Sequence, residues 1–251
     1  MTSVKNIYDF LNSYAPVELQ EDYDNAGFLC GKLDYCVNKV ILALDATSDV
    51  ISEAKEKGAE LIITHHPLIW GKLSKVTGEN TIGNKLFSLI NNDISVISMH
   101  TNLDKILVNQ VLIKSLAEGE YKKINDFMYS GCLDKPICMK QYLPICRDAL
   151  KNEGLRYYDS GKLVYKIACI GGAGDEGLYE AYIAGCDTYV TADIRHHVFL
   201  EAKELGINLI DGDHFNTENL AMFSLADMLS KEFADVKFSV AESNLQVVHY
   251  A

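Results

Sequence analysis

Residues 39–64, KVILALDATSDVISEAKEKGAELIIT, indicate the fold class on their own. Two apolar runs, 39–44 and 60–64, have the length and composition of buried strands. Between them lies a helical pattern that we expect to be capped by Ser48 and ended by Gly58, since glycine suits the left-handed conformation after a helix. Strand, helix and strand form a βαβ unit, which predicts parallel strands joined by a right-handed crossover.

The same rhythm continues on both sides of this unit. An amphipathic pattern predicts a first helix over 4–14, stopped by Pro16. Further helices are expected over 80–91, 177–184, 196–205 and 217–233, and further strands over 94–99, 163–170, 187–191 and 207–211. The segment 119–165 predicts antiparallel strands around 127–133 and a short helix near 143–150, and the stretches VKFSV and NLQVVHY near the end predict two closing strands.

The length of 251 residues favours one large domain or two lobes. No Pro- or Ser-rich linker separates the halves, so we expect two intimately packed α/β lobes with mixed sheets. We place the first lobe at 1–125 and the second at 126–251, with the last elements packing back on the first lobe.

Charge argues against several partners. The net charge is −12, and only three of the 23 cationic side chains are arginines. Such a surface repels a phosphate backbone, so nucleic acid and an anionic membrane are poor partners. No run of 18 apolar residues predicts a membrane span, and the first residues, MTSVKNIYDFLNSYAP, do not resemble a signal peptide. The seven cysteines include no C-x-x-C pair, which favours reduced thiols and a cytoplasmic protein.

Histidines gather where predicted strands end. The residues are His65 and His66 after the strand 60–64, His100 after 94–99 with Asp104 four residues on, and His214 after 207–211 with Glu218 four residues on. In open α/β sheets, ligands bind in the crevice outside the carboxyl ends of the strands. The pattern therefore predicts one polar site in that crevice.

Imidazoles and carboxylates without thiolates suit zinc, iron, manganese or cobalt. One ion needs three or four ligands and more are offered, so we expect two ions that share a bridging carboxylate. Adjacent His65 and His66 point to different sides of an extended chain, which lets each serve a different ion. A helical turn would put His214 and Glu218 on one face. The alternative is a set of hydrogen-bonded loop histidines that bind no metal.

Six blocks carry a family resemblance. THHPLIW (64–70), SMHTNLD (98–104), TADIRHH (191–197) and DGDHFNTE (211–218) resemble the four signature blocks of the Nif-three-like, or YbgI-like, dinuclear metal-centre family, and DNAGFLCG (24–31) and ILALDAT (41–47) resemble its two early blocks. Members of this family are often called GTP cyclohydrolase I type 2 homologues. The blocks occur in the family's order and span nearly the whole chain, so the resemblance implies the Nif-three-like fold.

The resemblance implies roles for individual residues. His65 and Asp104 match ligands of one ion, His66 and His214 match ligands of the other, and Glu218 matches the bridging carboxylate. His100, Asp193 and His197 match positions that line the cavity, and we take His100 and His197 as candidate catalytic residues for proton transfer. His100 could equally well only orient a ligand. Asp45 either orients a histidine or caps the next helix.

The resemblance also implies an activity and an assembly. Two divalent ions per chain, zinc, iron or manganese, would generate hydroxide that attacks a nucleotide or a related heterocycle, as in a GTP cyclohydrolase I type 2. The alternative is a non-catalytic metal-binding protein that stores or delivers a metal or metallocofactor. The partner expected is a small molecule, with six chains in a ring built as a trimer of dimers.

Three features depart from the pattern or stay open. Asp213, Ala192 and Tyr23 stand where the family usually has Gly, Gly and Trp. The turn GGAGDEG (171–177) is either a plain tight turn, which we favour, or a phosphate-binding loop. A weak repeat aligns Glu53-Ala54 with Glu180-Ala181 and Glu201-Ala202, which reflects either convergent helix caps or a duplicated α/β unit.

Overall fold

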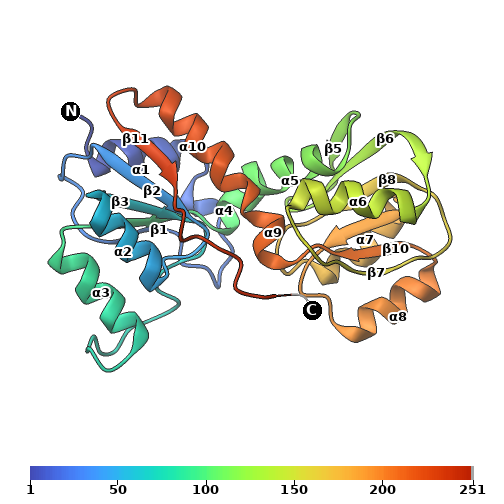
Figure 1. The fold of residues 1–251 in the computed structure, drawn as a ribbon, viewed down its shortest axis with the longest axis horizontal. Coiled ribbons are helices and arrows are strands. Elements are labelled where there is room, and N and C mark those ends of the chain that lie inside the picture. The colour runs from blue at the N-terminus through green and yellow to red at the C-terminus, as the bar shows by residue number, and fades with distance from the viewer. Residues whose placement is uncertain (250–251) are drawn as a thin grey trace. The chain divides into compact units, whose positions relative to one another are not determined.

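The computed structural model describes residues 1–249 and separates the chain into two compact units. The first unit comprises Met1–Leu103 and Met222–Leu245, and the second comprises Asp104–Ala221 with the residues from Gln246 onward. Each unit is built on one mixed sheet, which confirms the predicted α/β class with two mixed sheets (Figure 1). The chain passes between the units three times.

The first unit is a five-stranded sheet with helices on its two faces. Its strands are β1 (Gly27–Cys30), β2 (Lys39–Ala43), β3 (Leu61–Thr64), β4 (Ser95–Ser98) and β11 (Lys237–Val240), and its helices are α1 (Val4–Tyr14), the 3-10 turn η1 (Val17–Leu19), α2 (Ser48–Lys57), α3 (Thr81–Asn91), α4 (Thr101–Leu103) and most of α10 (Leu220–Glu232). The strand order is β1-β4-β3-β2-β11, and β1 is antiparallel to its neighbour while the others run parallel.

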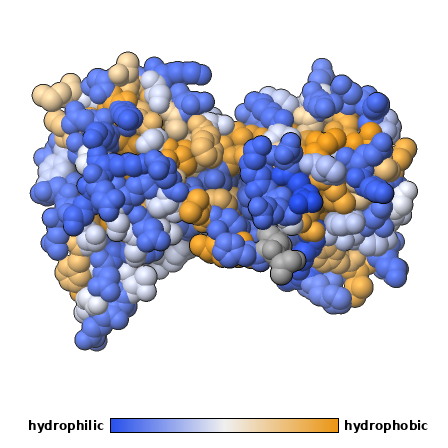
Figure 2. Space-filling view, in the orientation of Figure 1, coloured by the Kyte–Doolittle hydropathy of each residue, from blue (hydrophilic) through white to orange (hydrophobic). Residues whose placement is uncertain are grey.

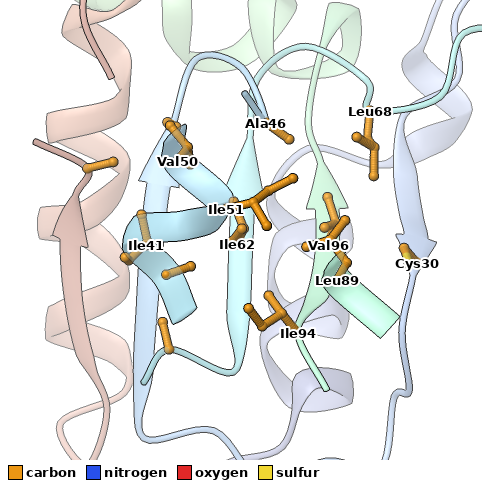
Figure 3. Close-up of a cluster of buried hydrophobic side chains, with 14 of the residues drawn as sticks. Cys30, Ile41, Ala46, Val50, Ile51, Ile62, Leu68, Leu89, Ile94 and Val96 are labelled. Carbon is orange, nitrogen blue, oxygen red and sulfur yellow. The ribbon is translucent and has the colours of Figure 1, made fainter. Parts of the chain in front are cut away.

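The core of this unit explains why its βαβ unit could be predicted from the sequence. Ile41, Ile62 and Val96 from neighbouring strands pack with Val50 and Ile51 of α2 in one buried cluster (Figure 3). Successive strand residues point to opposite faces, so an all-apolar strand is buried on both sides. This core fixes the register of β2, β3 and β4, and with it the level at which these strands end.

The predicted start of α2 was wrong by one residue. The cap is Thr47, whose backbone is extended and whose hydroxyl accepts a hydrogen bond from Val50 N–H at 3.1 Å. Ser48 already belongs to the helix. Gly58 ends the helix in the left-handed conformation, with φ of 65°, as predicted.

The second unit has a six-stranded sheet. Its strands are β5 (Tyr121–Lys123), β6 (Tyr129–Ile137), β7 (Arg156–Tyr158), β8 (Val164–Cys169), β9 (Thr188–Thr191) and β10 (Asn208–Asp211), and its helices are the π-helical turn η2 (Asp104–Val108), α5 (Asn109–Leu116), α6 (Met139–Leu150), the 3-10 turn η3 (Asp175–Gly177), α7 (Leu178–Ile183), α8 (His196–Leu205) and α9 (His214–Glu218). The order is β5-β6-β8-β9-β10-β7, with β8, β9 and β10 parallel.

Several predicted elements differ from those observed. The single helix expected over 217–233 is two, because α9 ends at Glu218 and α10 begins at Leu220. Of the two closing strands only β11 forms. Residues 244–249 form no strand, and Tyr250 lies outside the described residues. The helical run over 101–116, which includes the π-helical turn, was not predicted.

Polar residues cover most of the visible face of each unit (Figure 2). Among the described residues, no helix combines the length and apolar character needed to cross a membrane.

Candidate metal centre

Three histidines of the first unit lie together at the carboxyl ends of β3 and β4. A nitrogen of each of His65, His66 and His100 lies within 4.8 Å of the other two. Their ring centroids are 5.1 to 5.5 Å apart. The backbone N–H groups of His65 and His66 donate to Ala43 O and Leu44 O, so pairing with the β2 chain continues past β3 and fixes both residues. The first unit therefore brings together the three histidines that the sequence placed at these strand ends.

Each of these rings is held through Nδ1. His65 Nδ1 lies 2.8 Å from Met99 O, on the β4 side, and His66 Nδ1 lies 2.9 Å from Asp45 Oδ1, at the end of β2. Asp45 thus orients a histidine, one of the two roles considered for it. Histidines that bind metals usually bond their second nitrogen to an oxygen, which fixes the tautomer. The Nδ1 contacts of these rings are therefore of the kind that metal-binding histidines make.

Asp24 holds the third ring. Its Oδ1 lies 2.8 Å from His100 Nδ1, and its Oδ2 accepts from Thr101 N–H at 3.0 Å and from the Thr101 hydroxyl. Burial would raise the pKa of Asp24, but the hydrogen bonds from His100 and Thr101 outweigh it and hold the pKa well below the ordinary 3.8. Asp24 is therefore a carboxylate at neutral pH. Sequence reasoning missed this residue, although it begins the DNAGFLCG block.

In the second unit, α9 presents a histidine and a carboxylate on one face. His214 Nε2 lies 3.2 Å from Glu218 Oε2, as the four-residue spacing predicted. His214 Nδ1 lies 2.8 Å from Asp193 Oδ2, so this ring too is held by an oxygen. Glu218 is 4% exposed.

Asp104 belongs to the same unit and lies near Glu218. The two carboxylates have oxygens within 4.8 Å of each other, and Asp104 is 9% exposed. Asp104 begins the π-helical turn η2, and such single turns are frequent at functional sites. The Asn109 side chain donates to Asp104 O at 3.2 Å, which ties the turn to α5.

The glycine-rich turn packs directly on this pair. A Cβ added to Gly172 would lie 2.1 Å from Glu218 Oε1 and 3.2 Å from His214 Nε2. The N–H groups of Gly171, Gly172 and Gly174 already donate to side chains of Asn109, Thr217 and Thr191. These amides are thus committed to the fold, which favours the tight turn over the phosphate loop.

Two aspartates near His214 have left-handed backbones. Asp193 has φ of 53° and Asp213 has φ of 70°. The second value suits the glycine that the family resemblance implies before this histidine, because glycine adopts positive φ without strain. Asp213 keeps that conformation, and its side chain accepts a hydrogen bond from Gln246. Ala192 is fully buried, and its N–H donates to Gly172 O at 2.9 Å.

His197 stands apart from these groups. It is exposed on the first turn of α8. Over residues 1–249, it is in none of the His, Asp and Glu groups whose ligand atoms lie within 4.8 Å of one another. Its role in proton transfer stays a prediction.

The residues present fit a divalent metal ion. Each unit by itself offers suitable donors, three imidazoles in the first and an imidazole with two carboxylates in the second, and such donors are typical ligands of zinc, iron and manganese. All four histidines have Nδ1 against an oxygen, an arrangement typical of histidines that bind a metal through the other ring nitrogen.

The chain is similar to proteins named for GTP cyclohydrolase. It is 33% identical to a GTP cyclohydrolase 1 type 2 homolog of Clostridium perfringens over 251 residues, which cover 95% of this chain and 96% of the relative. It is 31% identical to a GTP cyclohydrolase 1 type 2 of Helicobacter pylori, covering 91% of this chain and 92% of the relative.

Solved structures share the fold. A hypothetical protein of Staphylococcus aureus superposes with a TM-score of 0.90 at 27% identity, covering 99% of each chain. A Bacillus cereus protein related to NIF3 has a TM-score of 0.92 at 19% identity, covering 100% of this chain and 99% of that one, which shows the fold alone. The family model described as Duf34/NIF3 (NGG1p interacting factor 3) matches residues 2–247, so the chain belongs to this family.

Proposed function

We propose that this protein is a hydrolase that uses two divalent metal ions, in the manner of a GTP cyclohydrolase I type 2, on a nucleotide or a related heterocycle. The observation that carries the proposal is the set of four histidines whose Nδ1 atoms are all held by oxygens. Four rings oriented in this way are expected for metal ligands and are unusual for scattered surface histidines. The names of the relatives support the reaction class.

The ligands we propose follow the family pattern. His65 and Asp104 would hold one ion, His66 and His214 would hold the other, and Glu218 would serve both. Zinc, iron and manganese all suit these donors. When bound, such ions lower the pKa of water and polarise an oxygen of the substrate.

The chain's own residues have three tasks in this proposal. Asp45, Asp193 and the Met99 carbonyl orient ligand rings, so that each Nε2 is aimed before an ion arrives. The buried carboxylates of Asp104 and Glu218 supply the negative charge that offsets the ions. Asp24 holds His100 through Nδ1, which leaves His100 Nε2 to accept and return a proton.

Metal analysis and a substrate screen test the proposal. Anaerobically purified protein should hold about two divalent ions per chain, as expected for a shared carboxylate. It should release formate from GTP, or hydrolyse another nucleotide, cyclic amide or phosphoester, only when metal is present. Ions that leave easily, with no turnover on any substrate class, would favour a metal reservoir or chaperone. A metal content that stays near zero after reconstitution would contradict both functions.

His100→Ala distinguishes proton transfer from orientation. A group that moves protons should retain both ions and lose about 10²–10⁴-fold in rate. A group that only orients a ligand should lose metal affinity, with the rate restored by excess metal. Normal metal content with a normal rate would remove His100 from the mechanism. His196→Ala, at an exposed histidine outside the candidate set, serves as the comparison.

We further propose that the protein assembles as a ring of six chains, as the family resemblance implies, and acts in the cytoplasm on a small-molecule substrate. Sedimentation at micromolar concentration tests the assembly, and a monomer would reject it.

A further inference from the structure

The chain's single tryptophan is exposed beside the three-histidine group. Trp70 ends the THHPLIW block, and 54% of it is open to solvent. Its ring centroid lies 5.2 Å from that of His100, with the two planes at 89°. Exposure alone is ordinary here, because Tyr179 and Phe223 are exposed to the same extent, 55% and 54%. What distinguishes Trp70 is that its exposed indole contacts a candidate catalytic histidine.

The position of this indole is built into the fold. The Asn25 side chain donates to Ile69 O at 2.8 Å, which fixes the backbone immediately before Trp70. Asn25 N–H donates to Asp24 Oδ1 at 2.7 Å, the same oxygen that holds His100. Two consecutive residues of one loop thus set the places of both rings. The backbone that carries the indole is therefore tied to the loop that holds His100.

We propose that Trp70 is a stacking platform for the planar heterocycle of the substrate, an inference that rests on the proposed function. An indole face binds purine and pyrimidine rings through their π-faces, with little dependence on which base is present. The chain has a net charge of −12, so long-range attraction gives little affinity for an anionic nucleotide. Stacking on a neutral ring supplies affinity that does not depend on charge. A ring stacked there would lie beside His100.

The competing account is that Trp70 only packs against His100 and keeps it in place. That account predicts that removing the indole changes metal content or the rate and leaves the affinity for a base unchanged. The stacking account predicts that removing the indole weakens the binding of a base. It also predicts that phenylalanine, which keeps an aromatic face, largely replaces tryptophan.

The experiment measures binding to metal-loaded protein. Guanosine, GTP and inorganic triphosphate are titrated into the wild type, Trp70→Ala, Trp70→Phe and Phe87→Ala. Phe87 is a matched control, because it is 43% exposed on α3 of the same unit, outside the segments that carry the histidines. Equilibrium dialysis gives the affinity of every variant. The emission of the single tryptophan reports stacking directly in the wild type and in Phe87→Ala.

We expect guanosine and GTP to quench the Trp70 emission and inorganic triphosphate to leave it unchanged. Trp70→Ala should bind guanosine about 5- to 150-fold more weakly, the range for loss of one base–aromatic stack. Trp70→Phe should retain most of the affinity, and Phe87→Ala all of it, with equal metal content throughout.

Failure of the stacking platform and failure of the proposed hydrolase function give different results. Unchanged guanosine affinity in Trp70→Ala, or no quenching by guanosine or GTP in the wild type, would overturn the platform. Quenching and weakened binding without turnover of any substrate would retain the platform and refute the hydrolase. Turnover with an unchanged KM in Trp70→Ala would retain the hydrolase and refute the platform.

Discussion

In each unit an aspartate near a strand end holds a histidine ring, but the backbone conformations differ between the two units. In the first unit Asp45, at the end of β2, holds His66 at 2.9 Å, and in the second Asp193, after β9, holds His214 at 2.8 Å. Asp193 and the residue before His214 both have positive φ, whereas among the described residues of the first unit's histidine group none does. The first group rests on ordinary strand ends, and the second on turns that L-residues adopt at a cost.

This difference indicates where each group is vulnerable. The first relies on burial, since His65 is fully buried and its pairing with the β2 chain continues the sheet. The second relies on close approach, since Gly171 and Gly172 pack on the Glu218 side chain. Backbone changes should therefore damage the second group more, and side-chain changes should damage both.

The largest effect is expected at the proposed bridge. Glu218→Gln removes one negative charge from a carboxylate that we assign to both ions, so both should lose occupancy together. His66→Ala should empty mainly one. Metal analysis and anomalous scattering on both variants measure this, with Glu204→Gln, an exposed residue of α8, as control. Full occupancy of both sites in Glu218→Gln would contradict the bridging role.

A second test compares two glycines of the second unit that share a left-handed backbone. Gly172→Ala would place a Cβ 2.1 Å from Glu218 Oε1, so the carboxylate must move and metal affinity should fall. Gly185 has a φ of 72°, and no atom lies within 4 Å of a Cβ added there. Gly185→Ala should therefore cost about 1–2 kcal/mol of stability and leave the metal affinity intact. Chemical unfolding and metal titration separate the two effects. Equal metal affinity in both variants would show that Gly172 is only a turn residue.

The orienting aspartates should have intermediate effects. Asp45→Asn and Asp193→Asn each weaken an oxygen contact to a histidine Nδ1, which typically costs about 10- to 100-fold in metal affinity. Competition with a chromophoric chelator measures it, with the exposed Asp34→Asn as control. If the two groups form sites of one kind, the losses should be similar. A loss confined to Asp193→Asn would show that the first unit's ring is held without its carboxylate.

The smallest effect is expected at Glu53, one of the residues of the weak sequence repeat. Burial would raise the pKa of Glu53, but hydrogen bonds from Lys57 and Ser243 outweigh it and lower the pKa from 4.5 to about 2. A lowered pKa stabilises the fold above about pH 4.5, and that stability is lost as the pH falls toward 2. Glu53→Gln should therefore cost about 2 kcal/mol at pH 7 and progressively less below pH 4.5. Urea unfolding measures the difference.

Glu201 is the control for this change, because it holds the matching place in the repeat and is exposed. Glu201→Gln should be nearly neutral at every pH. A pH-independent cost of Glu53→Gln would show that the charge of Glu53 is not what stabilises the 242–243 segment.

The sequence predicted what depends on local pattern. Strands such as 60–64 are readable because burial on both faces demands continuous apolar runs, and histidines after them share one edge of the sheet. The spacing of His214 and Glu218 predicted their contact because both lie within one helical turn.

What escaped prediction depends on distant segments. Asp24 and His100 are in contact although they lie 76 positions apart in the sequence, and no periodic pattern indicates such a contact. The π-helical turn at Asp104 is a rare helical form, and no periodic pattern in the sequence indicates it. The close approach of Gly172 to Glu218 likewise exists only once the turn and α9 are in place.

The position of β11 has a consequence for how the protein is made. Lys237–Val240 pairs with Lys39–Leu42, so an edge of the first sheet is completed only by a segment that is synthesised after residues 104–221. Until then β2 presents unpaired backbone groups, a template for pairing with other chains. Residues 104–221 of the second unit are contiguous and emerge earlier. The nascent second unit can therefore fold before β11 is available to complete the first sheet. A chain truncated near residue 235 would lack β11, and we expect it to aggregate.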